Sequence, residues 1–215
     1  MPIIISIGGS IIVPDEIDVP FLKKLKTFFQ KQKNNFILII GGGKTARKYQ
    51  HAAQKLNLDK TAQDWIGIAS TTLNAELLHY LFPNSKILEN PFQKTKAKIL
   101  IAHGWKPGRS TDYVAVALAK TYNAKLVINL TNQDYVFDKD PRKFKDAKIL
   151  KQISWKQMKK IVGNKWRPGL NMPFDPIASK LASKLKIRVA IANGRNLKNL
   201  KKIIDNKPFK GTLIS

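Results

Sequence analysis

Short apolar segments alternate with longer segments of mixed polarity along most of the chain. A short apolar run bounded by turn residues is typical of a strand buried in a parallel sheet. Six segments are the predicted strands: Ile3–Ile7, Phe36–Ile40, Lys86–Leu88, Ile99–Ala102, Ala124–Leu130 and Ile187–Ala192. Because segments of helical character separate most of them, the pattern predicts an α/β fold around a parallel sheet.

The segments between these strands carry apolar residues at the spacing of an amphipathic helix. In the first of them, Val19, Leu22 and Leu25 fall on one helical face. The predicted helices are Asp18–Lys33, Thr45–Leu56, Asp59–Phe82, Tyr113–Tyr122, Ser154–Val162, Pro176–Leu185 and Asn196–Ile204. We expect the third of these to form one or two helices with a break near Asp64–Gly67, and residues 211–215 to form an edge strand.

The second predicted strand ends in the glycines Gly41–Gly43, which precede a helix. This order brings backbone N–H groups and a helix N-terminus close to a phosphate. Gly43-Lys44-Thr45 resembles part of a P-loop, but that motif needs a glycine where this chain has Leu38. The glycine spacing also fits the loose dinucleotide-binding fingerprint, so this turn predicts a bound anion without identifying it.

The first predicted strand ends in a similar way, in Gly8-Gly9-Ser10. Neighbouring strands of a parallel sheet end at the same edge, which is where ligands of open α/β sheets bind. We therefore expect the two glycine turns to form one phosphate cradle.

A third candidate ligand loop covers residues 103–112, which hold two glycines, a proline, basic side chains and hydroxyls immediately before a helix. A helix N-cap at Ser110 or Thr111 would explain one hydroxyl but not the whole cluster. Asp64 is either a solvated or capping aspartate or an acceptor for substrate hydroxyls.

Acidic residues are scarce, and those retained in loops are candidates for function. Residues 131–141 hold three aspartates, although an Asp-Pro turn is sufficient to explain Asp140. Asp175 opens a predicted helix whose first residue is Pro176, a favoured position for proline. The Gly/Pro-rich connection at residues 163–175 is expected to move.

The composition excludes several classes of function. The chain of 215 residues can bury a large core and contains no cysteine, which excludes disulfides, thiolate metal sites and cysteine nucleophiles. Its three histidines lack ligand spacing, so we expect no structural metal. No apolar run is long enough to cross a bilayer and the N-terminal segment lacks the features of a signal peptide. We expect a cytoplasmic protein without a membrane partner.

The formal net charge of +25 would suit a polyanionic partner, because 39 Lys and Arg face only 14 Asp and Glu. The basic residues are mostly lysines spread over nearly every segment, without an arginine-rich arm or a basic tract interleaved with aromatic residues. A proteome-wide preference for Lys and Asn would produce the same charge. We therefore do not expect a nucleic acid as a specific partner.

Taken together, the segments resemble the amino acid kinase superfamily and, within it, the uridylate (UMP) kinases of the archaeal type. The resemblance covers nearly the whole chain and rests on the joint order and spacing of its motifs. These are Ile7-Gly-Gly-Ser-Ile-Ile-Val-Pro14, Gly41-Gly-Gly-Lys-Thr-Ala-Arg-Lys-Tyr49, Asp64-Trp-Ile-Gly-Ile68 with Asn74-Ala75, Pro107-Gly-Arg-Ser-Thr-Asp112, Thr131-Asn132 with Asp140-Pro141, Asp175-Pro-Ile-Ala-Ser-Lys180, and Gly211-Thr-Leu-Ile214.

The resemblance implies an αβα sandwich on a mostly parallel sheet, with residues 1–122 as the acceptor-nucleotide lobe and residues 123–215 as the ATP-binding lobe. It implies Mg²⁺-dependent transfer of the γ-phosphoryl group of ATP to UMP, a step of pyrimidine nucleotide biosynthesis. It also implies a hexamer built from dimers.

The resemblance further assigns roles to individual residues. The expected catalytic residues are Asp175, which would organise the catalytic groups, Lys180, which would balance charge on the transferring phosphoryl, and Arg47, which would lie between the two nucleotides. The expected ATP-binding residues are Gly9, Ser10, Gly43, Arg47, Thr131, Phe137 and Asp140. The expected UMP-binding residues are Gly42, Asp64, Trp105, Lys106, Pro107, Gly108, Arg109, Ser110 and Thr111.

Three positions depart from the superfamily pattern. Ser6 stands where many members carry a catalytic lysine, although the archaeal-type uridylate kinases also vary there; Lys180, Arg47 or Lys44 would then carry more of the charge. Tyr135 replaces a usual glycine and could reshape the ATP loop. Phe137 replaces a common tyrosine, which removes a hydroxyl but keeps the ring.

Three alternatives remain open from the sequence. Another kinase of the superfamily, acting on a carboxylate or an isoprenoid phosphate, would usually be longer or carry a different acceptor loop. A non-catalytic basic RNA-binding or regulatory protein on the same fold would keep its function without Asp175. A dinucleotide-binding oxidoreductase needs an acidic residue at the end of the strand after the glycines, but Asp59 and Asp64 lie in a predicted helix.

Overall fold

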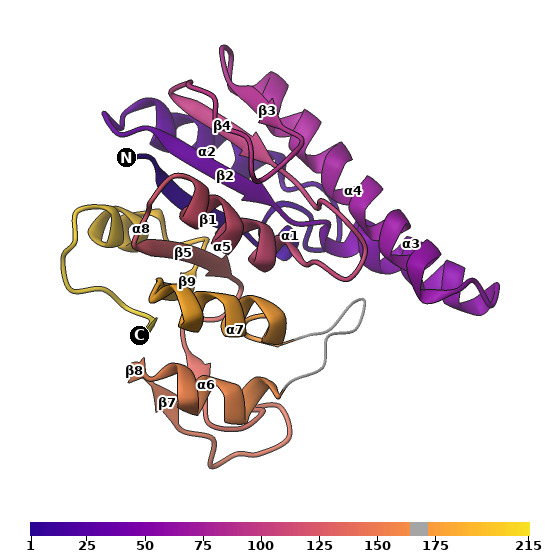
Figure 1. Cartoon of the computed structure of the whole chain (residues 1–215), viewed down its shortest axis with the longest axis vertical. Coiled ribbons are helices and arrows are strands. Elements are labelled where there is room, and N and C mark those ends of the chain that lie inside the picture. Colours follow the sequence, from indigo (N-terminus) through magenta and orange to yellow (C-terminus); the bar gives the residue numbers. More distant parts are fainter. Residues whose placement is uncertain (164–171) are drawn as a thin grey trace.

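The computed structural model describes residues 1–163 and 172–215, and its centre is an eight-stranded sheet (Figure 1). The strands lie in the order β3-β4-β2-β1-β5-β9-β10-β8. Every neighbouring pair in this sheet is parallel except β9 and β10. The bounds are β1 Ile3–Ile7, β2 Phe36–Ile40, β3 Lys86–Leu88, β4 Ile99–Ala102, β5 Leu126–Thr131, β8 Gln152–Ile153, β9 Arg188–Asn193 and β10 Thr212–Ile214.

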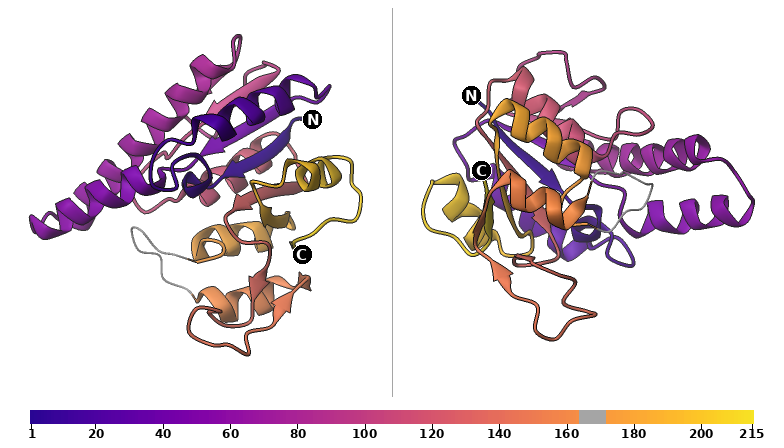
Figure 2. Two further views of the ribbon diagram at one scale, coloured as in Figure 1. Left: turned by 180° about the vertical axis from the view of Figure 1, so that it is seen from behind. Right: turned by 60° about the horizontal axis from the view of Figure 1, so that its bottom comes forward.

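Helices cover both faces of the sheet, which accounts for the uninterrupted apolar character of its central strands. On one face α5, α6 and α7 bury residues such as Val116, Met158 and Ala178. On the other face α2, α4 and α8 bury residues such as Leu25 and Leu200 (Figure 2). The bounds are α1 Gly9–Ile12, α2 Val19–Gln30, α3 Gly43–Lys55, α4 Lys60–Leu81, α5 Thr111–Thr121, α6 Trp155–Val162, α7 Pro176–Leu185 and α8 Leu197–Ile204. The predicted αβα sandwich on a mostly parallel sheet is confirmed.

The break predicted near Asp64–Gly67 is wrong. α4 runs without interruption from Lys60 to Leu81 and, together with α3, projects beyond the sheet as a helical hairpin (Figures 1 and 2). Gly67 permits close packing of the two helices, because a Cβ there would lie 2.4 Å from Nε2 of Gln50 on α3. This glycine therefore marks a helix–helix contact and not a helix end.

The prediction of a C-terminal edge strand is also wrong. β10 lies inside the sheet, between β9 and the short edge strand β8. The sequence analysis missed β8 and a separate antiparallel pair, β6 Val136–Phe137 and β7 Ile149–Leu150. Strands of two residues are too short to show a hydrophobic period. Most of the connection at residues 163–175 that was expected to move lies outside the described residues.

Helix N-caps occur where the sequence predicts them. The Ser110 hydroxyl accepts the Tyr113 N–H at 3.2 Å and so caps α5. Ser154 caps α6 in a reciprocal capping box with Gln157. Asp175 caps α7 through the Ala178 N–H at 2.7 Å. These caps fix where the helices begin, at the edge of the sheet where the strands end.

Candidate active site

The two glycine turns pack against each other, backbone to backbone. A Cβ on Gly9 would lie 1.9 Å from the Gly43 nitrogen, and one on Gly41 would lie 2.4 Å from the Gly9 nitrogen. β1 and β2 are parallel neighbours in register, so the two turns leave the sheet side by side. Only glycine allows this approach, and it places the N-termini of α1 and α3 at one point. The two turns therefore lie together as predicted, and that they bind a phosphate stays a prediction.

A cavity of about 510 Å³ opens beside this cradle. It brings together both glycine turns, the start of α3, the middle of α4, the loop before α5 and Asn132 after β5. Ten residues with predicted roles line it: Gly9, Ser10, Gly42, Gly43, Arg47, Asp64, Lys106, Arg109, Ser110 and Thr111. Segments far apart in the sequence therefore meet in one cavity that is rich in N–H groups and positive charge.

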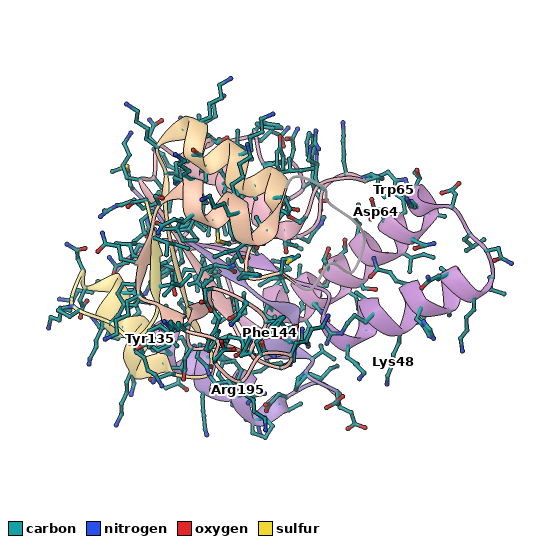
Figure 3. The ribbon with its side chains drawn as sticks, turned by 90° about the horizontal axis from the view of Figure 1, so that it is seen from below. Lys48, Asp64, Trp65, Tyr135, Phe144 and Arg195 are labelled. Atoms are coloured by element: carbon teal, nitrogen blue, oxygen red, sulfur yellow. The ribbon has the colours of Figure 1, made fainter. Side chains whose placement is uncertain are left out.

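Asp64 reaches this cavity from the helical hairpin. Figure 3 shows Asp64 with Trp65 on α4, and Lys48 on the neighbouring α3. The Asp64 Oδ2 atom accepts the Gly108 N–H at 2.8 Å. Desolvation raises the pKa of the Asp64 carboxyl, and the Gly108 hydrogen bond partly opposes this effect. The carboxylate thus holds the loop before α5 and still has Oδ1 for a ligand hydroxyl.

The loop of residues 104–110, which we call the acceptor loop, is fixed at its first residue as well. The Gly104 N–H donates to the Thr71 hydroxyl at 2.8 Å, and that hydroxyl donates to the Ile68 carbonyl. Within the loop Arg109 lies over the Tyr113 ring, 4.8 Å from its centroid. Two basic side chains, Lys106 and Arg109, line the cavity from this loop, which suits an anionic ligand group.

Two carboxyl groups meet where α5 and α7 begin. The Asp175 N–H donates to Asp112 Oδ2 at 3.1 Å, and the Ser6 hydroxyl lies 3.5 Å from Asp112 Oδ1. Asp175 is buried, and its Oδ2 atom has no hydrogen-bond partner among the described residues. Desolvation, with repulsion from Asp175, raises the pKa of Asp112 to about 7, and burial also raises the pKa of Asp175. Such a pair attracts a cation or a proton.

Several predicted residues lie outside the lining of this cavity. Asp175 is buried at the start of α7, and Lys180 is exposed on the same helix. Trp105 stacks edge-on against Phe92, with ring centroids 5.2 Å apart. The other predicted residues outside the lining are Pro107, Gly108, Thr131, Phe137 and Asp140.

The predicted ATP residues of the segment after β5 make local contacts. The Thr131 hydroxyl accepts the Gln133 N–H at 3.0 Å. Asp140 binds Arg142 through two side-chain hydrogen bonds of 3.0 and 2.9 Å, and this guanidinium lowers the pKa of the carboxyl. Tyr135 lies beside the C-terminal segment, on the opposite side of the molecule from Asp64 (Figure 3). With Phe209 it lines a second, smaller cavity of about 310 Å³.

Five polar residues of the site had no role assigned from the sequence: Ser6, Gln50, Thr71, Asp112 and Asn132. Gln50 and Thr71 lie in the interior of helices, where polar residues usually face solvent. Asp112 is the last residue of the predicted ligand loop and one of only fourteen acidic residues, which could have pointed to a role.

The described residues contain no group of three or more histidine or acidic side chains arranged to hold a metal ion. Among the helices that the structure describes, none is long and apolar enough to span a membrane.

The sequence of this chain is similar to those of known proteins. The sequence profile of the Amino acid kinase family matches residues 1–193. The chain is 34% identical to a uridylate kinase of Pyrococcus abyssi, across 100% of this chain and 99% of the relative. It is also 34% identical to a uridylate kinase of Methanococcus aeolicus, across 100% of both chains.

Solved structures give the same result. The crystal structure of a uridylate kinase from Archaeoglobus fulgidus superposes with a TM-score of 0.83 at 30% identity, covering 100% of both chains. A UMP kinase structure from Bacillus anthracis superposes with a TM-score of 0.79 at 18% identity, covering 100% of this chain and 97% of that chain. The second likeness concerns the fold alone.

Proposed function

The chain belongs to the amino acid kinase family, and we propose that it is a uridylate kinase, which transfers the γ-phosphoryl group of ATP to UMP and yields UDP and ADP. The observation that carries this proposal is the single cavity in which both glycine turns, Asp64 and the acceptor loop meet. The uridylate kinases that resemble this chain do so over its full length. The same activity assigns the enzyme to pyrimidine nucleotide biosynthesis.

In this proposal UMP occupies the part of the cavity between α4 and the acceptor loop. The free Oδ1 atom of Asp64 accepts a ribose hydroxyl, while Lys106 and Arg109 neutralise the UMP phosphate. Ser110 and Thr111 add hydroxyls at the N-terminus of α5, which favours an anion. Gly42 packs closely against the first turn of α3, since a Cβ there would lie 2.5 Å from the Ala46 methyl group.

ATP occupies the side of the cradle nearer β5. Gly9, Ser10 and Gly43 offer backbone N–H groups at two adjoining helix N-termini, which suit the β- and γ-phosphates. The segment with Thr131, Phe137 and Asp140 would carry the nucleoside. This assignment requires Asp140 to exchange part of its contact with Arg142 for the ligand.

The chemistry needs positioning and positive charge, not a nucleophilic side chain. In the transition state of the transfer, the phosphoryl group carries negative charge on its equatorial oxygens, and nearby cations stabilise that charge. Arg47 lines the cavity at the start of α3, between the two proposed phosphate sites. Lys180 is exposed on α7, so its proposed contribution requires a side-chain movement toward the cavity.

Magnesium is the proposed cofactor and arrives with ATP. The buried Oδ2 atom of Asp175 has no hydrogen-bond partner among the described residues, and the backbone N–H of the same residue donates to the Asp112 carboxylate. Magnesium prefers carboxylate, phosphate and water oxygens, so the residues present fit it and these two aspartates would hold it. When bound, magnesium would neutralise negative charge near position 6, where this chain has Ser6 and not a lysine.

Several wider features belong to the same proposal. Residues 1–122 form the acceptor lobe and residues 123–215 the ATP lobe, and the enzyme acts in the cytoplasm, where its nucleotide substrates are used. The proposed assembly is a hexamer built from dimers, and the exposed face of α4, where Leu73, Leu77 and Tyr80 are 65%, 38% and 80% exposed, supports a contact between copies. Exposed apolar side chains at this spacing suit a contact with a second copy.

The other functions considered from the sequence have less support. Turnover of a carboxylate or isoprenoid phosphate does not explain the Asp64 carboxylate in the cavity, because neither acceptor carries a ribose hydroxyl for its free Oδ1 atom. A non-catalytic RNA-binding role does not explain the unpartnered Asp175 atom inside the protein.

Replacing Asp175 by Asn tests the proposed role of this carboxylate. Asn is as good an N-cap as Asp, so α7 and the fold should survive. We expect kcat for UMP in a coupled ADP-release assay to fall roughly 10²- to 10³-fold, because a charge next to the transferring group is lost. Asp59→Asn, which changes the N-cap of α4 outside the cavity, is the matched control and should leave kcat unchanged. A folded Asp175→Asn enzyme within about twofold of wild type would refute the role.

A further inference from the structure

His103 is a buried histidine that lies outside the cavity but directly before the acceptor loop. It follows the last residue of β4, and only 7% of its surface is exposed. Its Nδ1 atom lies 2.7 Å from the Gly104 carbonyl oxygen, and its Nε2 atom lies 3.1 Å from the Glu89 carboxylate. Glu89 follows the end of β3, so the ring joins the ends of two neighbouring strands.

Each of the two ring nitrogens has an acceptor oxygen beside it. A carbonyl oxygen and a carboxylate accept hydrogen bonds, so a ring nitrogen that carries a hydrogen can donate to the one it faces. Thr72 on α4 also approaches Nδ1, at 3.3 Å, while its own hydroxyl lies within hydrogen-bond distance of the Ile68 carbonyl.

These bonds fix the first residue of the acceptor loop through both of its backbone polar groups. Thr71 accepts the Gly104 N–H from α4, and His103 donates to the Gly104 carbonyl from β4. Four residues later, Asp64 accepts the Gly108 N–H. Between these two points the loop carries Lys106, and immediately after them Arg109, into the cavity. The backbone is therefore pre-ordered before a ligand binds.

We propose that His103, held between the Gly104 carbonyl and Glu89, is a positioning residue that orders the acceptor loop and so sets the KM for the acceptor nucleotide. The proposal rests on the proposed uridylate kinase activity and assigns part of its acceptor affinity to a residue that does not touch the substrate. Pre-ordering a loop raises affinity because less ordering remains to occur on binding. It should leave the transfer step almost unchanged.

Steady-state kinetics of three variants test this proposal. His103→Asn keeps a donor near Nδ1 and removes the pairing with Glu89, whereas His103→Leu removes both bonds. Glu89→Gln removes only the charge of the partner, at a side chain that is 73% exposed, so it does not endanger the fold. We expect the KM for UMP to rise roughly threefold in Glu89→Gln, more in His103→Asn, and tenfold or more in His103→Leu.

The split between parameters separates positioning from general damage. We expect kcat and the KM for ATP to stay within about twofold of wild type in Glu89→Gln and His103→Asn. His79→Asn is the matched control, because His79 lies on α4 and its ring pairs with the Ser85 hydroxyl, not with the acceptor loop. An unchanged KM for UMP in both Glu89→Gln and His103→Asn, or an equal loss in kcat and in both KM values, would overturn the proposal.

Failure of the proposed function gives a different result. If the wild type turns over an acceptor other than UMP, the same comparison is made with the KM for that acceptor. The uridylate kinase assignment would then be lost, while the ranking of the three variants would still decide the role of His103.

Discussion

At the scale of single residues, the site depends on contacts that few other side chains would permit. Gly9 and Gly41 allow the two turns to touch through their backbones. Ser6, in contrast, is a small hydroxyl 3.5 Å from Asp112 Oδ1, and no lysine or arginine of the described residues forms a salt bridge with Asp112 or Asp175. The protein retains this arrangement although it raises the pKa of both aspartates.

This carboxyl pair should make stability depend on pH. Asp112 has a pKa of about 7 in the folded protein, against an ordinary value of 3.8. Between these values the folded state holds a proton that the unfolded chain has lost, so the free energy of unfolding falls as the pH rises through this window. The decrease ends once the pH exceeds the folded pKa.

Asp112→Asn should remove most of this pH dependence. The amide oxygen of Asn can still accept the Asp175 N–H, so the structure is kept. We expect the variant and the wild type to be similarly stable near about pH 4, and the variant to be more stable by roughly 2–4 kcal/mol near about pH 8. Denaturant unfolding without nucleotide or magnesium measures this difference.

The control for this prediction is Asp15→Asn, which changes a carboxylate that is 85% exposed. Equal stabilities of Asp112→Asn and the wild type near about pH 8 would mean that folding does not raise the pKa of Asp112. The Asp175 carboxyl, whose pKa is also raised, remains in the variant and should leave a smaller residual slope.

At the scale of elements, the periodic helices and the apolar strands were predicted, including the three-residue β3, whereas the two-residue strands β6, β7 and β8 were not. The bounds of β1, β2 and α7 match their predicted ranges because continuous apolar runs and a capped Asp-Pro start are local features. The unbroken α4 and the interior position of β10 depend on partners distant in the sequence. Gln50 packing against Gly67 has no local sign.

Thr212 on β10 illustrates such a distant dependence. This fully buried hydroxyl accepts the Val136 N–H at 2.9 Å and donates to the Leu150 carbonyl, so it joins the pair β6–β7 to the main sheet. Thr212→Val keeps the shape and leaves both backbone groups without this partner. We expect a loss of roughly 2–4 kcal/mol in the free energy of unfolding, and a higher KM for ATP because Phe137 lies on β6.

Thr212→Ser is the matched control for this prediction, since it keeps the hydroxyl and removes one methyl group. It should retain most of the stability, and urea unfolding compares the three proteins. If Thr212→Val is as stable as Thr212→Ser, the hydroxyl does not hold the strand pair in place.

At the scale of the whole molecule, positive charge is unevenly distributed. Residues 147–204 contain fifteen Lys and Arg but only one acidic residue, Asp175, and that residue is buried. Nucleotide substrates are anions, and a strongly positive protein attracts them over distances longer than a direct contact. The net charge of +25 therefore has a consequence for the rate of substrate capture.

We expect kcat/KM for UMP to fall roughly three- to tenfold when the ionic strength rises from about 0.05 to 0.5 M, with a smaller change in kcat. Salt screens the long-range attraction but acts weakly on a substrate already bound. Steady-state rates in potassium chloride and in potassium acetate measure the effect and separate screening from competition by chloride. A kcat/KM that stays constant or rises with salt would contradict this expectation.

The sequence predicted the cradle and most of the cavity because glycine turns and polar loops after strands are local patterns. It could not place Asp112 beside Asp175, or Thr71 and His103 on either side of Gly104. Those contacts arise only when α4, β4, α5 and α7 assemble around the sheet. Motif order identified the family, while packing determined which side chains share the site.

The most direct test of the central claim is a competition among acceptors in one reaction. Purified protein receives Mg-ATP labelled in its γ-phosphate together with equal concentrations of UMP, CMP, AMP, GMP, a carboxylate acceptor and an isoprenoid phosphate. Chromatography then identifies the labelled products. The account predicts that the label appears in UDP and depends on magnesium. Label that accumulates in another product in preference to UDP, or no label in any acceptor, would contradict it.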